Sequence, residues 1–440
     1  MLLLFLVIQI GNFAGDSLLP LEKVEITGNT VFNDAELFDM LNIYTLSRET
    51  IEEGIGRILK RYEEAGYPFV RVKPVKFRME NGGISFTIEM DEGVKFFIDD
   101  VRVEGNVVTK EDVVKREFRM RGSRIFDPKI IEKAKERIEG LGFLKVRSIQ
   151  PVSYEKGSGR GFLLVNLEEL SSSSFEGVMG YGAGKLGGFL KINTYNLFGT
   201  SRRLSGLYSS YADDRVNIRV SYTEPWVFSY PADLSFELNN ERFDTLTMVS
   251  KFRGCLMISP VFEFVFDIGA EWEKVIPGEE KWFGIMGGTY RGQNQFLSFS
   301  SRYGIHGVNR VTAGMERLFK WIFLSIKGDV CLEDSIPRHD LVMLGGANTV
   351  RGYEEGEIRG KAGVWSNVEY RLPIGGENRF FPFVDFGYVE LLDNTNLFMF
   401  GGGVGVSFLT PVGRWSIDYG IGRGKSPLQG KVHIRLKTTI

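Results

Sequence analysis

The chain has 440 residues, enough for two or three domains, and its formal net charge of −2 offers no broad basic surface for nucleic acid. The hydrophobic fraction is 43% and the mean hydropathy −0.08. No apolar run reaches the roughly 18 residues that a membrane-spanning helix needs, which excludes a helical membrane protein. The 53 glycines and 35 phenylalanines are typical of a transmembrane β-barrel, in which only alternate residues face lipid.

The chain begins with an apolar segment, MLLLFLVIQI over residues 1–10, which has the length of a signal-peptide core. The sequence GNFAG over residues 11–15 offers a cleavage site, although no Lys or Arg precedes the core. We therefore expect a secretory signal over residues 1–15, in preference to a buried strand.

An internal repeat fills the chain from there to about residue 169. The run Val24-Glu-Ile-Thr-Gly-Asn29 recurs as Val101-Arg-Val-Glu-Gly-Asn106, and Gly66-Tyr67 recurs as Gly142-Phe143. The offsets of 77 and 76 residues keep the spacing within the unit almost unchanged. Each copy is predicted to run strand, helix, helix, strand, strand.

Capping signals place the helices of both copies. Asn33 followed by Glu36 predicts a capping box, and Ser47 begins a second, amphipathic helix that Gly66 ends. In the second copy Asp127-Pro128 supplies a cap followed by proline at the first helical position.

This β-α-α-β-β unit of about 75 residues resembles the POTRA domain, because the Gly-Asn and Gly-aromatic positions fall where POTRA domains have them. The resemblance implies an α+β POTRA-like domain over residues 21–92 and another over residues 93–169. The alternative is a duplicated α+β domain of unrelated function.

Beyond the serine run at residues 171–174 helical periodicity disappears, and short alternating segments follow one another to the end of the chain. We expect an all-β transmembrane barrel of about 16 antiparallel strands over residues 174–440, since bacterial barrels have even strand numbers. A soluble sandwich or propeller is the alternative, but no blade period is found. The strands are expected to start near residues 175, 188, 201, 215, 232, 246, 261, 281, 295, 310, 321, 363, 380, 397, 414 and 431.

Residues 334–361 form the one long segment without a strand pattern, and long loops inside compact proteins are usually functional. Its centre carries Gly345 and Gly346, followed by Val350-Arg351-Gly352-Tyr353. Glycines permit close backbone approach, and the arginine offers five donors in a fixed geometry.

The phase of the next strands predicts partners for Arg351. If Val368 and Tyr370 face lipid, Glu369 faces the lumen. If Val384 and Phe386 face lipid, Asp385 also faces the lumen. We therefore expect these two carboxylates to bind the loop arginine.

Four motifs occur in the order in which similar ones occur in the outer-membrane insertase and translocator superfamily, whose best-known members are the BamA-type assembly proteins. They are Val350–Tyr353, Glu369-Tyr-Arg-Leu-Pro373, Phe383-x-Asp385-x-Gly387 and Pro411-x-Gly413. The chain resembles this superfamily, and the resemblance implies a protein of the outer membrane of a double-membraned bacterium, with its N-terminal domains in the periplasm.

The resemblance also implies a mechanism. The POTRA-like domains meet unfolded outer-membrane proteins, and the first and last barrel strands pair weakly and open sideways into the lipid bilayer. Periplasmic chaperones and accessory lipoproteins are further candidate partners, whereas nucleic acid, metal and cofactor are not expected. The lateral seam would bring Val178 near Ile434, and its residues are Gly177, Val178, Gly180, Gly182, Ile434 and Leu436.

Three other functions are compatible with parts of the sequence. A two-partner secretion transporter of the same superfamily also has two POTRA domains, but it usually carries an N-terminal plug helix, for which the residues before Leu21 leave little room. A passive porin would not need the repeats, and a barrel-embedded lipase would need a catalytic set that we do not find. One departure from the superfamily is the last residue, Ile440, where an aromatic residue is common.

The cysteines and histidines give no sign of a reactive centre. Cys255 and Cys331 are too few for a disulfide framework, and we expect two isolated thiols. His306, His339 and His433 lack metal-ligand spacing, so neither a metal site nor an enzyme is expected.

Overall fold

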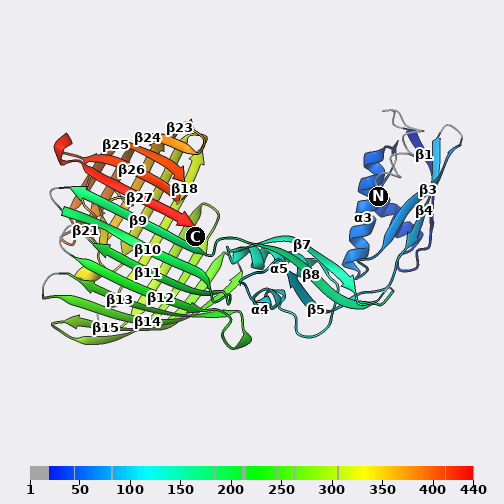
Figure 1. Cartoon of the computed structure of the whole chain (residues 1–440), viewed down its shortest axis with the longest axis horizontal. Coiled ribbons are helices and arrows are strands. Elements are labelled where there is room, and N and C mark those ends of the chain that lie inside the picture. The colour runs from blue at the N-terminus through cyan, green and yellow to red at the C-terminus, as the bar shows by residue number, and fades with distance from the viewer. Residues whose placement is uncertain are drawn as a thin grey trace. The chain divides into compact units, whose positions relative to one another are not determined.

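The computed structural model describes residues 19–439, except 44, 81–82, 156, 183–184, 211–214, 244–245, 262, 305–306 and 412. The expected signal segment, His306 and Ile440 therefore lie outside the described residues. The chain divides into two compact units, one up to Glu169 and one from Leu170 onward (Figure 1). None of the described helices is both long and apolar enough to cross a membrane.

The first repeat is a four-stranded sheet in the order β2-β1-β4-β3, covered by two helices. Its elements are β1 (Leu19–Thr27), α2 (Asp34–Leu41), β2 (Thr45–Leu46), α3 (Arg48–Glu64), β3 (Arg71–Glu80) and β4 (Gly83–Asp91). The predicted capping box of Asn33 and Glu36 begins α2, and Ser47 caps α3. The α3 side chains Ile51, Ile58 and Tyr62 are fully buried against the sheet and form the core of this repeat.

The second repeat has the same sheet, in the order β6-β5-β8-β7. Its elements are β5 (Phe97–Glu104), α4 (Glu111–Lys115), η1 (Arg116–Phe118), β6 (Arg124–Ile125), α5 (Pro128–Gly140), β7 (Leu144–Ser153) and β8 (Arg160–Glu169). Asp127 caps α5 and Pro128 is its first residue, as predicted. The first and last strands of each repeat run parallel, β1 beside β4 and β5 beside β8.

The repeated Gly-Asn pair follows the first strand in both repeats. Gly28 and Gly105 have φ angles of +86° and +88°. A Cβ atom at these positions would lie 2.2 Å from the carbonyl oxygen of Met90 and 2.1 Å from that of Leu167. Only glycine fits, because the left-handed backbone passes directly over the last strand of the sheet.

A second repeated feature, which the sequence analysis missed, is a carboxylate at the end of the last strand. It is Glu92, one residue after β4, in the first repeat and Glu169, the last residue of β8, in the second. Each accepts hydrogen bonds from two backbone N–H groups of the loop after the first strand. The donors are Thr30 and Val31, both at 2.9 Å, and Val108 and Thr109, at 3.0 and 2.7 Å. The carboxylate therefore fastens the end of each repeat to its own beginning.

The second unit is a closed antiparallel barrel, and the prediction of sixteen strands is confirmed over the described residues. The barrel closes between its first strand, β9, and its last, β27, which lie side by side in Figure 1. A short strand, β23 (Leu372–Gly375), continues the edge of β22 along β24. The sixteen strands are β9 (Ser173–Gly182), β10 (Lys185–Leu197), β11 (Arg202–Ser210), β12 (Val216–Glu224), β13 (Ala232–Arg242), β14 (Met248–Val261), β15 (Phe264–Ile276), β16 (Glu280–Arg291), β17 (Gln295–Tyr303), β18 (Asn309–Phe319), β19 (Ile322–Cys331), β22 (Ala362–Tyr370), β24 (Asn378–Glu390), β25 (Asn396–Thr410), β26 (Gly413–Gly422) and β27 (Lys431–Thr439).

The barrel is inside-out relative to a soluble protein. Large apolar side chains are exposed on its outer surface, among them Leu190, Phe236, Phe266 and Phe299. Charged and polar side chains are buried within it, among them Asn217, Glu271, Glu273 and Arg302. Closure leaves no open sheet edge, so the backbone polar groups of the wall can lie in hydrocarbon.

Two sequence expectations about the barrel are wrong in detail. The strands expected to start near residues 188 and 261 begin three residues away, at Lys185 and Phe264. The long loop before β22 is also not free of strands. It contains a 3₁₀ turn, η3 (Arg338–Asp340), and a two-stranded sheet of β20 (Val342–Leu344) and β21 (Ile358–Gly360). Strands of three residues are too short to produce a recognisable alternation.

Candidate functional site: the lumen loop and the barrel seam

The loop of residues 332–361 folds back into the barrel, and its tip rests on a floor of glycine residues. Gly352 has a φ of +92°, and a Cβ atom there would lie 2.5 Å from the backbone of Gly422. A Cβ atom on Gly401 would lie 1.9 Å from the carbonyl oxygen of Arg351. The glycine run of β25 thus serves as a close-packing surface, which brings the loop backbone against the wall.

Arg351 is only 3% exposed, and its guanidinium binds carboxylates from two strands. Its Nε and Nη2 donate to the two oxygens of Asp385 at 2.8 and 2.9 Å, a bidentate pair. Its backbone N–H donates to the same carboxylate at 2.9 Å, and Nη1 donates to Glu369 at 3.0 Å. The structure therefore brings together the three residues that strand phase had placed in the lumen, and we call this group the Arg351 clamp.

Sequence reasoning missed two further members of the clamp. Asp418 on β26 lies 3.7 Å from Arg351 Nη1, and the guanidinium carbon lies 3.5 Å from the ring centre of Phe383. Phe383 begins the Phe383-x-Asp385-x-Gly387 motif, and Asp418 follows the Pro411-x-Gly413 motif. The signal for Asp418 was its alternation with Ile417 and Tyr419, which points the carboxylate inward.

The clamp keeps the arginine charged. Burial alone would lower the pKa of Arg351, but the hydrogen bonds and negative charge of Asp385, with Glu369 and Asp418, raise it above its usual range. The loop arginine is therefore a permanent cation, and the surrounding carboxylates need it to offset their own charge.

Apolar side chains at the tip complete the docking. Val350 is fully buried and Tyr353 nearly so, in a cluster with Leu344, Val389 and Met399. The hydroxyl of Tyr353 lies 3.3 Å from the carbonyl oxygen of Phe400. Gly345 and Gly346 have φ angles of +114° and +101°, which turn the chain into this position.

The loop also binds the last strand of the barrel. Lys431 of β27 is 2.9 Å from Glu354, and Arg435 donates to Asn348 at 2.9 Å and to the carbonyl oxygen of Ala347 at 3.1 Å. These contacts connect the loop tip to one side of the line along which the barrel closes.

That line is the pairing of β27 with β9, which extends over eight residue pairs from Val432 opposite Tyr181 to Thr439 opposite Ser174. The β26–β27 pairing next to it has only seven. The expected weakness of the seam is therefore not visible in the length of its pairing.

The register corrects two details of the predicted seam. Gly177 lies opposite Leu436 and Gly180 opposite His433, whereas Gly182 lies beyond the seam and pairs with Lys185 of β10. Val178 and Ile434 are near each other across the seam, as expected, but the directly opposite pairs are Val178 with Arg435 and Met179 with Ile434. A shift of one residue reverses the face, since Val178 is buried and Met179 is 54% exposed on the outer surface.

An apolar hollow of about 480 Å³ lies over the seam, lined by residues of β9, β10, β11, β26 and β27. It exists because the strands at this place carry glycine where neighbouring strands carry large side chains. Its lining includes Gly177, Met179, Gly188, Leu190, Trp415 and Leu436. Side-chain packing over the line of closure is thus reduced by the glycines of β9 and β10.

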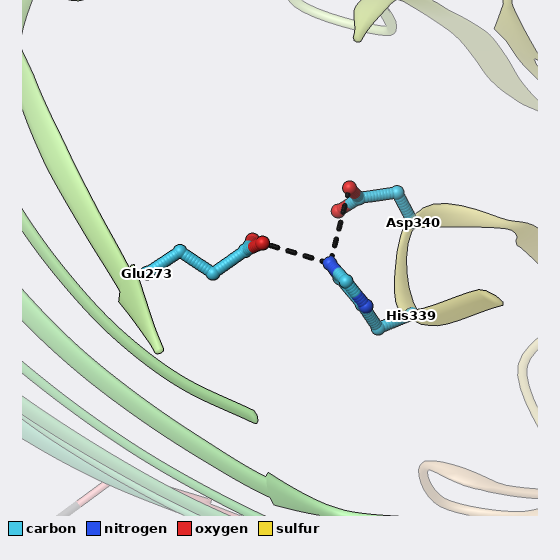
Figure 2. A group of neighbouring side chains, drawn as sticks. All are labelled: Glu273, His339 and Asp340. Atoms are coloured by element: carbon cyan, nitrogen blue, oxygen red, sulfur yellow. Dashed lines mark hydrogen bonds and ion pairs between the residues drawn. The ribbon is translucent and has the colours of Figure 1, made fainter. Parts of the chain in front are cut away.

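A second polar cluster lies within the barrel, away from the Arg351 clamp. Figure 2 shows His339 and Asp340 of η3 beside Glu273 of β15, with His339 Nε2 3.1 Å from the glutamate and 3.5 Å from the aspartate. Sequence reasoning missed this cluster, because His339 and Glu273 are 66 residues apart.

The donor set of this cluster resembles that of a metal site, but its charges are already balanced. Each of the three residues can offer a ligand atom, and these atoms lie within 4.8 Å of one another. Lys251 and Arg302 occupy the same oxygens, with Lys251 Nζ 2.8 Å from Asp340 and 3.1 Å from Glu273. A divalent cation would have to displace these two cations, so the arrangement fits an ion-pair cluster better than a metal centre.

Family comparisons agree with this geometry. A family model described as the Omp85 superfamily domain matches residues 281–436, which include the loop, the clamp carboxylates and most of β27. A second, described as POTRA, surface antigen variable number repeat, matches residues 20–93 and 96–169. The chain contains an Omp85 superfamily domain preceded by two POTRA repeats. Its fold, two POTRA repeats followed by a closed barrel, is the one expected from the sequence, and it is an outer-membrane protein.

Relatives of this Omp85 chain include outer membrane protein assembly factors. The BamA of Neisseria meningitidis serogroup B is 25% identical over 263 residues, which is 55% of this chain and 32% of that protein. The BamA of Neorickettsia risticii is 28% identical over 186 residues, 42% of this chain and 23% of that protein. The chain thus matches a third or less of the length of these two relatives.

Solved structures show the same fold. BamA from Haemophilus ducreyi lacking POTRA domains 1–3 superposes with a TM-score of 0.63 at 18% identity, over 95% of this chain and 100% of that one. CdiB from Acinetobacter baumannii superposes with a TM-score of 0.57 at 14% identity, over 97% and 91%. At these identities the likeness concerns the fold alone.

Docking of the loop in this Omp85 chain should weaken as the pH rises from about 4.5 to about 7. Burial of the carboxyl raises the pKa of Glu355 to about 7, against the opposing effects of the Ala347 N–H and the Arg435 charge, although the side chain as a whole is only partly buried. A raised pKa means that the docked loop holds the proton more tightly than an undocked loop. Docking is therefore favoured most at low pH, and this advantage is lost between the ordinary glutamate pKa of 4.5 and about 7.

A nitroxide label at the exposed residue Asn348 measures this effect. Its spectrum should show more mobile loop at pH 8 than at pH 5.5, and Glu355→Gln should remove most of the difference. Asp334→Asn, a change of the same kind at an exposed site in the same loop, is the control and should leave the pH dependence intact. Equal pH dependence in the Glu355→Gln protein would assign the effect to another group.

Proposed function

We propose that the chain is an assembly factor that receives unfolded β-barrel proteins on its POTRA repeats in the periplasm and inserts them into the outer membrane through the β9–β27 seam. The observation that supports this most directly is the seam itself. The barrel closes there between its first and last strands, beneath an apolar hollow where glycine replaces large side chains. Opening it would offer two strand edges to a client inside the bilayer.

The loop has a defined part in this proposal. Arg351 fixes the tip to β22, β24 and β26, and Lys431 and Arg435 bind the tip to β27. The loop therefore holds one side of the seam in place while the other can separate. None of these steps requires a nucleotide or a metal, and accessory lipoproteins and periplasmic chaperones are candidate partners in delivering the client.

A secretion transporter is the second candidate, and the likeness to CdiB is the observation that favours it. Export through the lumen would require the loop to leave, because its tip is buried against the wall. Breaking the clamp exposes buried charges and is an additional cost that lateral insertion does not have. We therefore favour insertion.

Proteoliposomes that contain the full chain test the proposal. A denatured outer-membrane barrel added from outside should become membrane-embedded, measured as a protease-protected band that shifts on heating, faster than with empty liposomes or liposomes holding an unrelated porin. Passage of an added polypeptide into the vesicle interior without membrane embedding would instead support the transporter.

A further inference from the structure

The cluster of Figure 2 joins the loop to barrel strands other than those that bind its tip. Asp340 accepts from Lys251 Nζ of β14 at 2.8 Å and from Arg302 Nη1 of β17 at 2.7 Å. Its backbone carbonyl accepts from Arg310 of β18. Two charge-assisted bonds to the side chain and one to the backbone hold a single loop residue against three strands.

His339, the residue before Asp340, contacts a fourth strand, β15. Its Nε2 lies 3.1 Å from Glu273 of β15, and its ring lies 6.2 Å from that of Phe243 with an edge-on orientation. The wall residues are also bound to one another, since Arg302 Nη2 donates to Glu273 at 2.9 Å. The wall side of the cluster is therefore prearranged to receive η3.

The two points of attachment lie on different sectors of the barrel. The Arg351 clamp uses carboxylates of β22, β24 and β26, whereas the cluster around η3 uses β14, β15, β17 and β18. Strand β19 separates the two sectors. The loop is thus held at its base and at its tip, and Val342 and Leu344 of β20 between them pack over Gly363 of β22.

We propose that His339 and Asp340 are positioning residues that form a second anchor of the loop, so that the lumen stays obstructed until both the anchor and the Arg351 clamp are released. The inference concerns the loop and the pore, and it does not depend on whether the clients are inserted or exported. It assigns separate tasks to the two attachments. The clamp fixes the tip, and the anchor fixes the base.

Two label positions separate the attachments. Ser335 is exposed near the base and Asn348 is exposed at the tip, so a nitroxide at each reports the two ends of the loop. In the full-length protein, Asp340→Ala should mobilise the label at Ser335, whereas Arg351→Ala should mobilise the label at Asn348 and leave Ser335 unchanged. Asp334→Ala, an exposed aspartate in the same loop, is the matched control and should alter neither.

Conductance in planar lipid bilayers supplies a readout that a local structural role would not change. Each single variant should remain close to the wild-type ion conductance, and the Asp340→Ala, Arg351→Ala double variant should exceed both severalfold. If the Asp340→Ala variant loses the heat-modifiable migration on gels that marks a folded barrel, Asp340→Asn, which keeps the size of the side chain, replaces it in both measurements.

Either of two results would overturn the anchor. One is a Ser335 label that stays as immobile in the folded Asp340 variants as in the wild type. The other is a conductance in Arg351→Ala alone that equals that of the double variant. Both measurements are made without client protein, so failure of the insertion proposal would leave them unaffected.

Discussion

A disulfide between residues 179 and 434 should abolish the insertion of client barrels while leaving the protein folded, and reduction should restore insertion. Met179 and Ile434 are directly opposite each other across the seam, and a covalent bond there prevents β9 and β27 from separating. The variant is Met179→Cys with Ile434→Cys, in a chain whose buried Cys255 and Cys331 are replaced by alanine. Insertion into proteoliposomes is measured before and after reduction.

The control for this experiment is a second cross-strand disulfide away from the seam. Val220 and Leu238 are opposite each other on β12 and β13, and each is 44% exposed on the outer surface. Locking that pair should not affect insertion, because these strands are joined in every state of the barrel. Full insertion with the 179–434 bond verified by mass spectrometry would contradict lateral opening and favour export through the lumen.

The second large effect concerns the clamp. Arg351→Ala should leave Asp385, which is fully buried, without its cation and close to the carboxylates of Glu369 and Asp418, of which Glu369 keeps its ion pair with Arg371. Removing one partner of a buried ion pair costs about 3–5 kcal/mol, so the tip should leave its site and insertion should fall well below the wild-type rate. The barrel should remain folded, since its wall does not depend on the loop for closure.

Arg351→Lys distinguishes geometry from charge. A lysine can neutralise one carboxylate, but it cannot donate to both oxygens of Asp385 and to Glu369 in a fixed fork, so it should rescue only in part. Arg338→Ala, which removes an exposed arginine of the same loop, should leave insertion unchanged. Equal activity of the lysine and arginine proteins would show that the loop needs only a positive charge.

Strand phase was enough to find the core of the clamp. Along β22 and β24 apolar residues alternate with Glu369 and Asp385. The opposite orientation of these strands would place a carboxylate in hydrocarbon, which costs too much free energy. The same logic could have found Asp418. What alternation cannot provide is which inward residue meets which part of the loop, and therefore Phe383 was not predicted as a partner of Arg351.

Long-range pairing limited the rest of the prediction. His339 meets Glu273 only because the loop folds back into the lumen, and no local pattern in either segment signals the other. The seam likewise joins strands from the two ends of the barrel domain, and no turn connects them to fix their register. The sequence therefore indicated Val178 for the position opposite Ile434, whereas the structure has Met179 there. Hairpin strands were easier to predict, since short turns restrict their pairing.

The carboxylates Glu92 and Glu169 have a consequence for the evolution of the POTRA repeats. Each ties the last strand of a repeat to a loop of that same repeat, so the fastening is self-contained. Glu92 and Glu169 are 77 residues apart, which is the length of one repeat. A gene duplication that copies the whole repeat therefore also copies the carboxylate and the loop to which it is hydrogen-bonded. Copies can be gained or lost without redesigning these bonds, which gives a physical reason for a family whose repeats vary in number.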